Sequence, residues 1–183
     1  MNFENIQIRE TKDTDFNDIM EVEKQAFVED SEAELTAQLL NDKSAKPRIS
    51  LIAFDGNKAV GHILFTKTTI ERNDICPLMH ILAPLAVIPE YQKQGIGGKL
   101  VREGLKRIKE IGSEIVFVLG HTEYYPKYGF IPNAERLGYS APNPIPTEVA
   151  DAWMVQPLTS KVLSNFGKVI CADMLNKPEY WQE

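Results

Sequence analysis

A glycine-rich turn is the first stretch of the chain whose residue types could bind a ligand. It runs from Gln92 to Gly98, after an apolar segment and before a segment that places Ile96, Leu100 and Leu105 on one helical face. Because glycine has no Cβ, N–H groups at such a helix start are open to an anion such as phosphate. The turn therefore predicts a phosphate-containing ligand, although a glycine-rich helix entry can also be a simple tight turn.

Two widespread phosphate motifs do not fit this turn. The Walker pattern requires a glycine at the position of Lys93 and a serine or threonine at the position of Leu100. The dinucleotide pattern requires its third glycine at the position of Leu100. These two mismatches disfavour a nucleotide-dependent enzyme.

A different pattern does match. Gln92, Gly95 and Gly97 form Gln-x-x-Gly-x-Gly, which resembles the coenzyme A pyrophosphate loop of the GCN5-related N-acetyltransferases (GNAT). The segment from Tyr124 to Phe130, Tyr-Tyr-x-x-Tyr-Gly-Phe, is similar to the aromatic Gly-Phe motif of the same superfamily. The chain is therefore identified as similar to the YhbS-like branch of predicted N-acetyltransferases.

The resemblance implies a fold and a co-substrate. The fold is mixed α/β (α+β), a mostly antiparallel central sheet with one splayed parallel strand pair and flanking helices, in one domain over residues 1–183. Acetyl-CoA would be the co-substrate, with no metal. Its pantetheine arm would lie against the backbone of Leu85, Ala86 and Val87. Its pyrophosphate would lie on the turn formed by Gln92, Lys93, Gln94, Gly95, Ile96, Gly97 and Gly98.

The resemblance also implies a proton donor. Tyr125 lies four residues before Gly129, where many family members keep a tyrosine close to the cofactor sulfur. A phenol of pKa ~10 can protonate a thiolate whose conjugate acid has a pKa of ~8.5 at modest cost. Tyr125 is therefore expected to be the general acid, with packing against cofactor or core as the alternative.

The base is less defined, because some relatives use an acidic residue where this chain has His80. An amine of pKa ~10.4 must lose a proton before it attacks. Imidazole titrates near neutrality, so His80 and His121 are candidates, and a structural role remains open for both. His62, on a hairpin strand, is expected to be structural.

The overall composition limits the kinds of partner that the protein can bind and the compartment in which we expect it. The 183 residues hold 26 acidic and 20 basic side chains, a net charge of −6, which disfavours a protein that mainly coats nucleic acid or anionic membrane. No apolar run reaches the ~20 residues of a membrane-spanning helix. Residues 1–5 lack a secretory pattern, and Cys76 and Cys171 form no Cys-x-x-Cys pair. We expect a cytoplasmic protein, and a homodimer is possible.

Hydrophobic periodicity predicts alternating strands and helices. Strands are expected at 6–8, 48–54, 59–70, 78–87 and 115–119, with Asp55-Gly56 turning a hairpin and Pro84 causing a bulge, an edge or a splay. Helices are expected after Asp13, after a Ser31 cap, and from the glycine turn to Gly112. Residues 132–146 are expected to form a functional loop with little strand potential.

The function expected is acetyl transfer from acetyl-CoA to a primary amine of a small molecule or peptide, by direct attack in a ternary complex. Glu29, Asp30 and Glu32 could favour a cationic amine, or could simply be a solvated helix start. The alternative is a non-catalytic acyl-CoA-binding or sensory module of the same fold. Use of longer acyl-CoAs stays open.

Overall fold

The strands of the chain form a mixed, open sheet. The computed structural model describes residues 5–160 and 163–181, so residues 1–4, part of the segment tested above for a secretory pattern, lie outside it. The strand order is β1-β2-β3-β4-β5-β8-β6, and β9 pairs with both β3 and β7. All pairs are antiparallel except β4–β5 and β7–β9, which confirms the expected fold class. The strands are β1 Ile6–Glu10, β2 Ile49–Asp55, β3 Lys58–Ile70, β4 Met79–Val87, β5 Ile115–Leu119, β6 Ile131–Pro132, β7 Tyr139–Ser140, β8 Trp153–Pro157 and β9 Gly167–Ile170.

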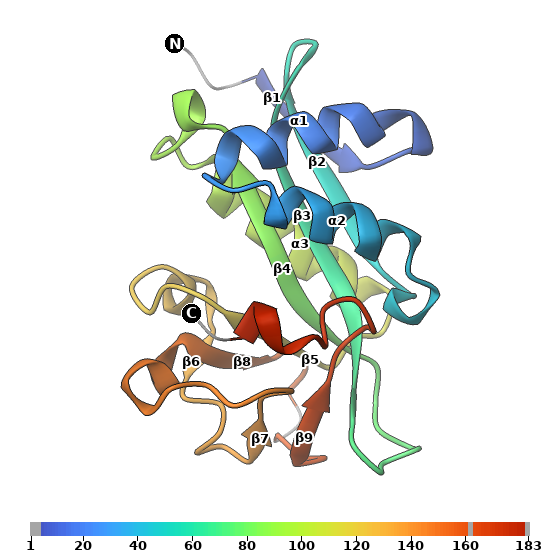
Figure 1. The fold of residues 1–183 in the computed structure, drawn as a ribbon, viewed down its shortest axis with the longest axis vertical. Helices are drawn as coiled ribbons and strands as arrows, with labels where there is room; N and C mark the ends of the chain where they lie inside the picture. The colour runs from blue at the N-terminus through green and yellow to red at the C-terminus, as the bar shows by residue number, and fades with distance from the viewer. Residues whose placement is uncertain (1–4, 161–162, 182–183) are drawn as a thin grey trace.

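In the described part of the chain, three α-helices cover the two faces of the sheet. Helices α1 (Phe16–Ala26) and α2 (Ser31–Asn41) lie in front of the long strands in Figure 1, and α3 (Ile96–Glu110) lies behind them. Two apolar cores result, because α3 packs against alternate residues of β2 and β3, whereas α2 and the C-terminal segments pack against the opposite face. None of the helices in the described ranges is both long enough and apolar enough to cross a membrane.

The start of α2 differs from the sequence expectation. Ser31 is the first residue of the helix rather than its cap, and Asp30 takes the N-cap position. The Ser31 hydroxyl donates to the Glu32 carboxylate at 2.8 Å, so it does not cap a backbone N–H. The expected hairpin is present, with Asp55 paired to Lys58 and Gly56 in a left-handed conformation at φ 59°.

The proline-rich region contains more strand than predicted. Residues 132–146 include part of β6 and all of β7, and Tyr139 of β7 is fully buried. Its ring lies edge-on to Phe117 at 5.3 Å between centroids, and its carbonyl accepts a hydrogen bond from the Trp153 indole at 2.8 Å. These contacts come from β5 and β8, so local sequence did not indicate them.

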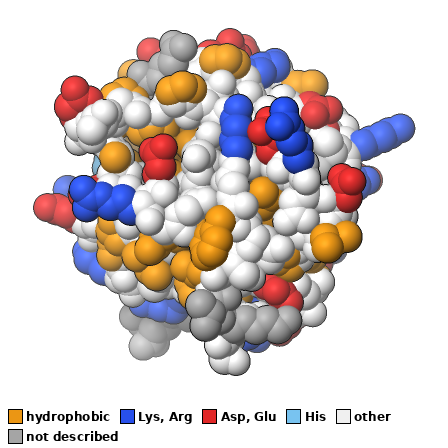
Figure 2. All heavy atoms as spheres, turned by 90° about the horizontal axis from the view of Figure 1, so that it is seen from below, with side chains coloured by type: hydrophobic (Ala, Val, Ile, Leu, Met, Phe, Trp, Pro, Cys, Tyr) orange, Lys and Arg blue, Asp and Glu red, His pale blue; other side chains and the backbone are white. Residues whose placement is uncertain are grey.

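Charged side chains do not segregate on the face seen in Figure 2. Lys and Arg side chains are interspersed there with Asp and Glu and with apolar groups. Within the residues that the structure describes, no three His, Cys, Asp or Glu side chains gather closely enough to hold a metal ion.

Gly104 sets the distance between α3 and the sheet. A Cβ on this residue would lie 2.2 Å from Cε2 of Phe65 on β3. We predict that Gly104→Ala lowers the free energy of unfolding by about 1–3 kcal/mol, because overpacking outweighs the better helix propensity of alanine. Urea denaturation measures this. Exposed Lys106→Ala on the same helix should change stability by less than about 0.5 kcal/mol, and equal effects would contradict the packing argument.

Candidate active site

The site begins where strands β4 and β5 stop pairing. Their parallel ladder runs from Met79–Ile115 to Leu82–Val118. The next β4 residues, Ala83, Pro84 and Leu85, are partly exposed, whereas the four before them are buried. Proline has no N–H to donate to a ladder, and the β3–β4 register shifts at the same level, between Ile63 and Phe65. Of the three alternatives for Pro84, the structure shows a bulge and a splay together.

The segment of β4 that no longer pairs with β5 still pairs with β3 along its other edge. Leu85 and Ala86 pair with Ile63 and His62 of β3, and β5 pairs with β8 on its far side. In an antiparallel strand, backbone groups point alternately to the two edges. Some N–H and C=O groups of residues 83–87 therefore face the gap, where an extended ligand could take the place of a strand.

The glycine turn lies directly after this segment. The Gln92 side-chain amide donates to the Val87 carbonyl at 2.9 Å, and the Gln94 amide donates to the Glu90 carbonyl at 2.9 Å. Lys93 and Gly95 are both left-handed, at φ 60° and 85°. Gln92 thus fixes the turn to the end of β4, and Gln94 fixes it to the short segment between β4 and α3.

Helix α3 starts at this turn with its backbone accessible. Gly95 is the N-cap, and its carbonyl accepts the first helical bond, from Lys99 N–H at 3.1 Å. A Cβ added to Gly95 would meet no atom within 4 Å, so the space beside the turn is open. The first N–H groups of a helix lack intrahelical acceptors and carry the positive end of the dipole. The turn can therefore bind an anion without a dense cluster of cationic side chains.

The two sequence motifs contact each other in the fold. A Cβ on Gly97 would lie 2.6 Å from the Tyr124 hydroxyl oxygen, and one on Gly98 would lie 2.5 Å from that of Tyr128. The two tyrosines belong to the loop after β5, and the Tyr128 ring lies under the Arg102 guanidinium at 5.1 Å. The glycines thus also provide room for the tyrosine hydroxyls. Sequence reasoning missed Arg102, because one arginine on a helix carries no signal of an aromatic partner.

Tyr125 lies in the apolar core, against the residue that follows β5. Its residue is 8% exposed, and its ring is edge-on to Tyr124 and to Phe130, with centroids 5.1 and 5.7 Å apart. Gly120, at the end of β5, leaves space for this ring, because a Cβ there would lie 2.4 Å from Cε2 of Tyr125. Burial, and to a lesser degree Tyr128, raises the pKa of Tyr125. The phenol therefore holds its proton at neutral pH and can act as a donor.

His80 lies far from the turn and is enclosed. The residue is 0% exposed, its Nε2–H donates to the Pro47 carbonyl at 2.8 Å, and Nδ1 is 2.8 Å from Ser113 Oγ. Ser113 follows the C-terminal end of α3, about 22 Å from the glycine turn for a 15-residue helix. Burial lowers the pKa of His80, so the ring is neutral. His121, in contrast, is exposed in the loop directly after β5.

Known proteins are similar to this chain in sequence. A family model described as an acetyltransferase (GNAT) domain matches residues 7–132. The chain is 52% identical over 163 residues to the uncharacterized N-acetyltransferase YjhQ of Escherichia coli K12, covering 89% of this chain and 90% of that protein. It is 32% identical over 108 residues to the uncharacterized N-acetyltransferase YhbS of the same strain, covering 58% and 62%.

Solved structures show the same fold. The crystal structure of the Escherichia coli GNAT-family protein YhbS in complex with CoA matches with a TM-score of 0.82 and 27% identity, over 94% of this chain and 92% of that chain. A GNAT-family acetyltransferase from Brucella melitensis in complex with acetyl-CoA matches with a TM-score of 0.75 and 24% identity, over 93% and 98%. The second likeness supports the fold alone.

The contact between Gly98 and Tyr128 can be tested by a double-mutant cycle. Gly98→Ala alone should destabilise the protein, because its Cβ would overlap the Tyr128 hydroxyl. In a Tyr128→Phe background the closest contact is gone, so we predict a smaller loss, with a coupling of about 1 kcal/mol. Urea denaturation of the four proteins measures the coupling. Strictly additive changes would show that the two motifs do not touch.

Proposed function

Because the chain belongs to the GNAT acetyltransferase family, and is thus an acetyl-CoA-dependent acyltransferase, we propose that its acceptor is a primary amine of a small molecule or peptide. The amine would attack the thioester directly, with both substrates bound at once. The observation that carries this proposal is the gap between β4 and β5, with an anion-binding turn at one end and a protonated phenol beside it.

The described residues fit coenzyme A. The gap exposes strand backbone at Leu85, Ala86 and Val87, which suits the amide groups of the pantetheine arm. The turn from Gln92 to Gly98 offers helix-start N–H groups beside open space, which suits a pyrophosphate. When bound, acetyl-CoA supplies an activated acetyl group. A β4 N–H that faces the gap would polarise the acetyl carbonyl.

Tyr125 is proposed as the general acid. Its raised pKa keeps the phenol protonated, and its ring is held by Tyr124, Phe130 and the space at Gly120. A fixed ring points the hydroxyl in one direction, which positions its proton for the departing sulfur.

We propose a structural role for His80 in place of the base role expected from sequence. A base must reach the amine directly or through water. The His80 ring is fully buried and has a partner at each nitrogen. Proton removal would then fall to water or to exposed His121, which belongs to the same loop as the tyrosines.

The acidic surplus favours an amine acceptor. Glu29 and Asp30 are exposed in the α1–α2 connection, and Glu32 is partly exposed at the start of α2. Such a local negative field attracts a cationic amine. A non-catalytic acyl-CoA-binding module, the alternative, would need the gap and the turn but not the Tyr125 proton.

Tyr125→Phe distinguishes an enzyme from a binding module. We predict that turnover falls on the order of 100-fold, because a general acid contributes about that much or more, while acetyl-CoA affinity changes by less than about twofold. Thiol release from acetyl-CoA in a screen of amines and peptides measures turnover, and calorimetry measures affinity. Unchanged turnover would remove Tyr125 as the acid.

Gly97→Glu tests the pyrophosphate site. Added bulk and a negative charge at the helix start should abolish the rise in melting temperature that acetyl-CoA causes in the wild type. Gln38→Glu, which adds the same charge at an exposed position of α2, is the matched control and should retain the full rise. A full rise in the Gly97 variant would mean that the pyrophosphate binds elsewhere.

A further inference from the structure

Three buried polar side chains form a hydrogen-bonded series that connects α1 to the sheet. The series lies outside the site described above. His62 of β3 has its Nδ1 2.6 Å from Oε1 of Glu23 on α1 and its Nε2 2.9 Å from Oγ of Ser50 on β2. The His62 and Glu23 side chains are both 0% exposed. The order hydroxyl, imidazole, carboxylate, with the two imidazole nitrogens on different partners, is that of a nucleophile, its base and the group that orients the base.

The proton positions follow from the chemistry of the three groups. Burial raises the pKa of Glu23, and the hydrogen bond with His62 opposes that rise. When Glu23 is a carboxylate, it accepts the Nδ1 proton, and Nε2 is left to accept the Ser50 hydroxyl proton. The second carboxyl oxygen of Glu23, Oε2, is buried and makes no hydrogen bond within the described residues.

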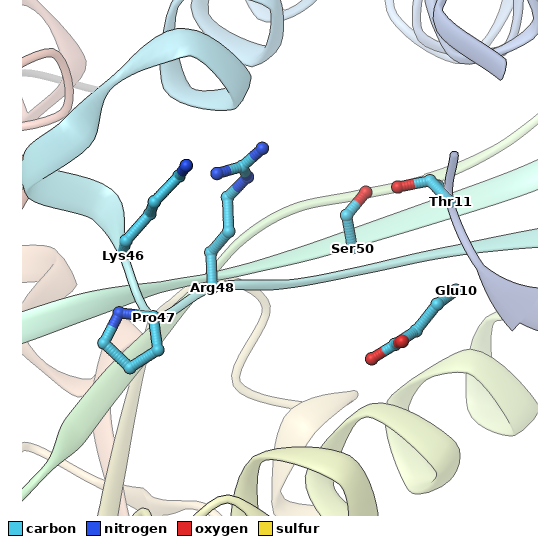
Figure 3. A pocket seen from close by; sticks show the side chains of 6 residues that line it. All are labelled: Glu10, Thr11, Lys46, Pro47, Arg48 and Ser50. Carbon is cyan, nitrogen blue, oxygen red and sulfur yellow. The ribbon is translucent and has the colours of Figure 1, made fainter. Parts of the chain in front are cut away.

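Ser50, at the hydroxyl end of this series, lines a pocket. Ser50 is 8% exposed and lines a pocket of about 580 Å³ at the place where β1 ends and β2 begins. Figure 3 shows Lys46, Arg48 and Ser50 pointing to the same side of β2, with the Thr11 hydroxyl directed toward Ser50. Glu10 points away from them toward α3, where it faces the charge of Arg107. The cations therefore lie on the serine side of the pocket.

We propose that Ser50, His62 and Glu23 form a second reactive centre, in which Ser50 is an activated nucleophile toward carboxylic esters bound in this pocket. Lys46 and Arg48 favour esters that carry a negative charge and stabilise the oxyanion that develops at the carbonyl. This activity uses neither acetyl-CoA nor the gap between β4 and β5.

The reaction balances without a further reactant. Ser50 Oγ bonds to the carbonyl carbon, its proton moves to His62 Nε2, and the alcohol leaves with that proton as its C–O bond breaks. Water then attacks the acyl-serine ester and gives a proton to Nε2. The carboxylic acid departs, and the proton on Nε2 returns to Ser50. One ester and one water become one acid and one alcohol.

A second serine–histidine pair in the same fold provides a comparison for this centre. Ser113 also contacts a histidine, with its Oγ 2.8 Å from Nδ1 of His80. There the other ring nitrogen meets a backbone carbonyl instead of a carboxylate, and Ser113 is 1% exposed. A fluorophosphonate probe, which forms an Oγ–P bond as fluoride leaves, should therefore modify Ser50 and not Ser113.

The experiment is labelling of the intact protein, without acetyl-CoA, by a fluorophosphonate, with the modified residue mapped by mass spectrometry. We expect one adduct, at Ser50, and none in Ser50→Ala. His62→Gln should slow labelling on the order of 100-fold, the contribution expected of a general base. Glu23→Gln should slow it as well, and melting curves establish that each variant is folded.

Two results would overturn the proposal. One is a wild-type protein that gains no adduct after long incubation. The other is an adduct that persists in Ser50→Ala or forms equally at Ser113. Because the assay contains no acetyl-CoA, a failure here leaves the acetyl transfer proposed above untouched. Gln38→Glu, at an exposed position of α2, should label at the wild-type rate. Hydrolysis of p-nitrophenyl acetate by the same set of proteins, followed by nitrophenolate release, gives the matching catalytic readout.

Discussion

The pairing of β4 with β5 is the constraint on which the rest of the site depends. The two parallel strands hold each other only as far as Leu82 and Val118. Beyond that point β4 remains bound to β3, and β5 remains bound to β8. The sheet therefore stays continuous at its outer strands while its centre opens. Backbone groups left at the opening need a partner, and an extended ligand with amide groups can provide one.

The opening is positioned relative to the turn and the tyrosines by close packing rather than by charge. Gly97 and Gly98 allow the loop after β5 to lie against the start of α3, and Gly120 allows the Tyr125 ring to lie against β5. The glycines at the start of α3 thus leave helix N–H groups accessible, and Gly120 leaves room for the Tyr125 ring. This arrangement explains how a chain of net charge −6 can offer a site for a phosphate-rich ligand. The backbone dipoles at the start of α3 can supply positive potential there.

Much of this site could be predicted from the sequence because its signals are local. The glycine turn, the Tyr125–Gly129 spacing and Pro84 each lie within a few residues, so periodicity and turn chemistry identify them. Contacts that depend on distant neighbours could not be read from the sequence. His80 is adjacent along β4 to the segment that opens, yet its side chain is held by Ser113 and Pro47 at the other end of α3. The burial of Tyr139 likewise depends on Phe117 and Trp153.

The sequence by itself determined the family, the order of the elements from β1 to β5 and the turn that starts α3. The reason is that each of these depends on residues close together in the chain. Tertiary structure alone decided which polar groups meet. Ser50 and Glu23 lie 12 and 39 residues from His62, in a strand and a helix that no motif links. Only the packing of α1 on the β2–β3 hairpin places their side chains within hydrogen-bonding distance, because side-chain contact depends on register and helix position rather than on residue type.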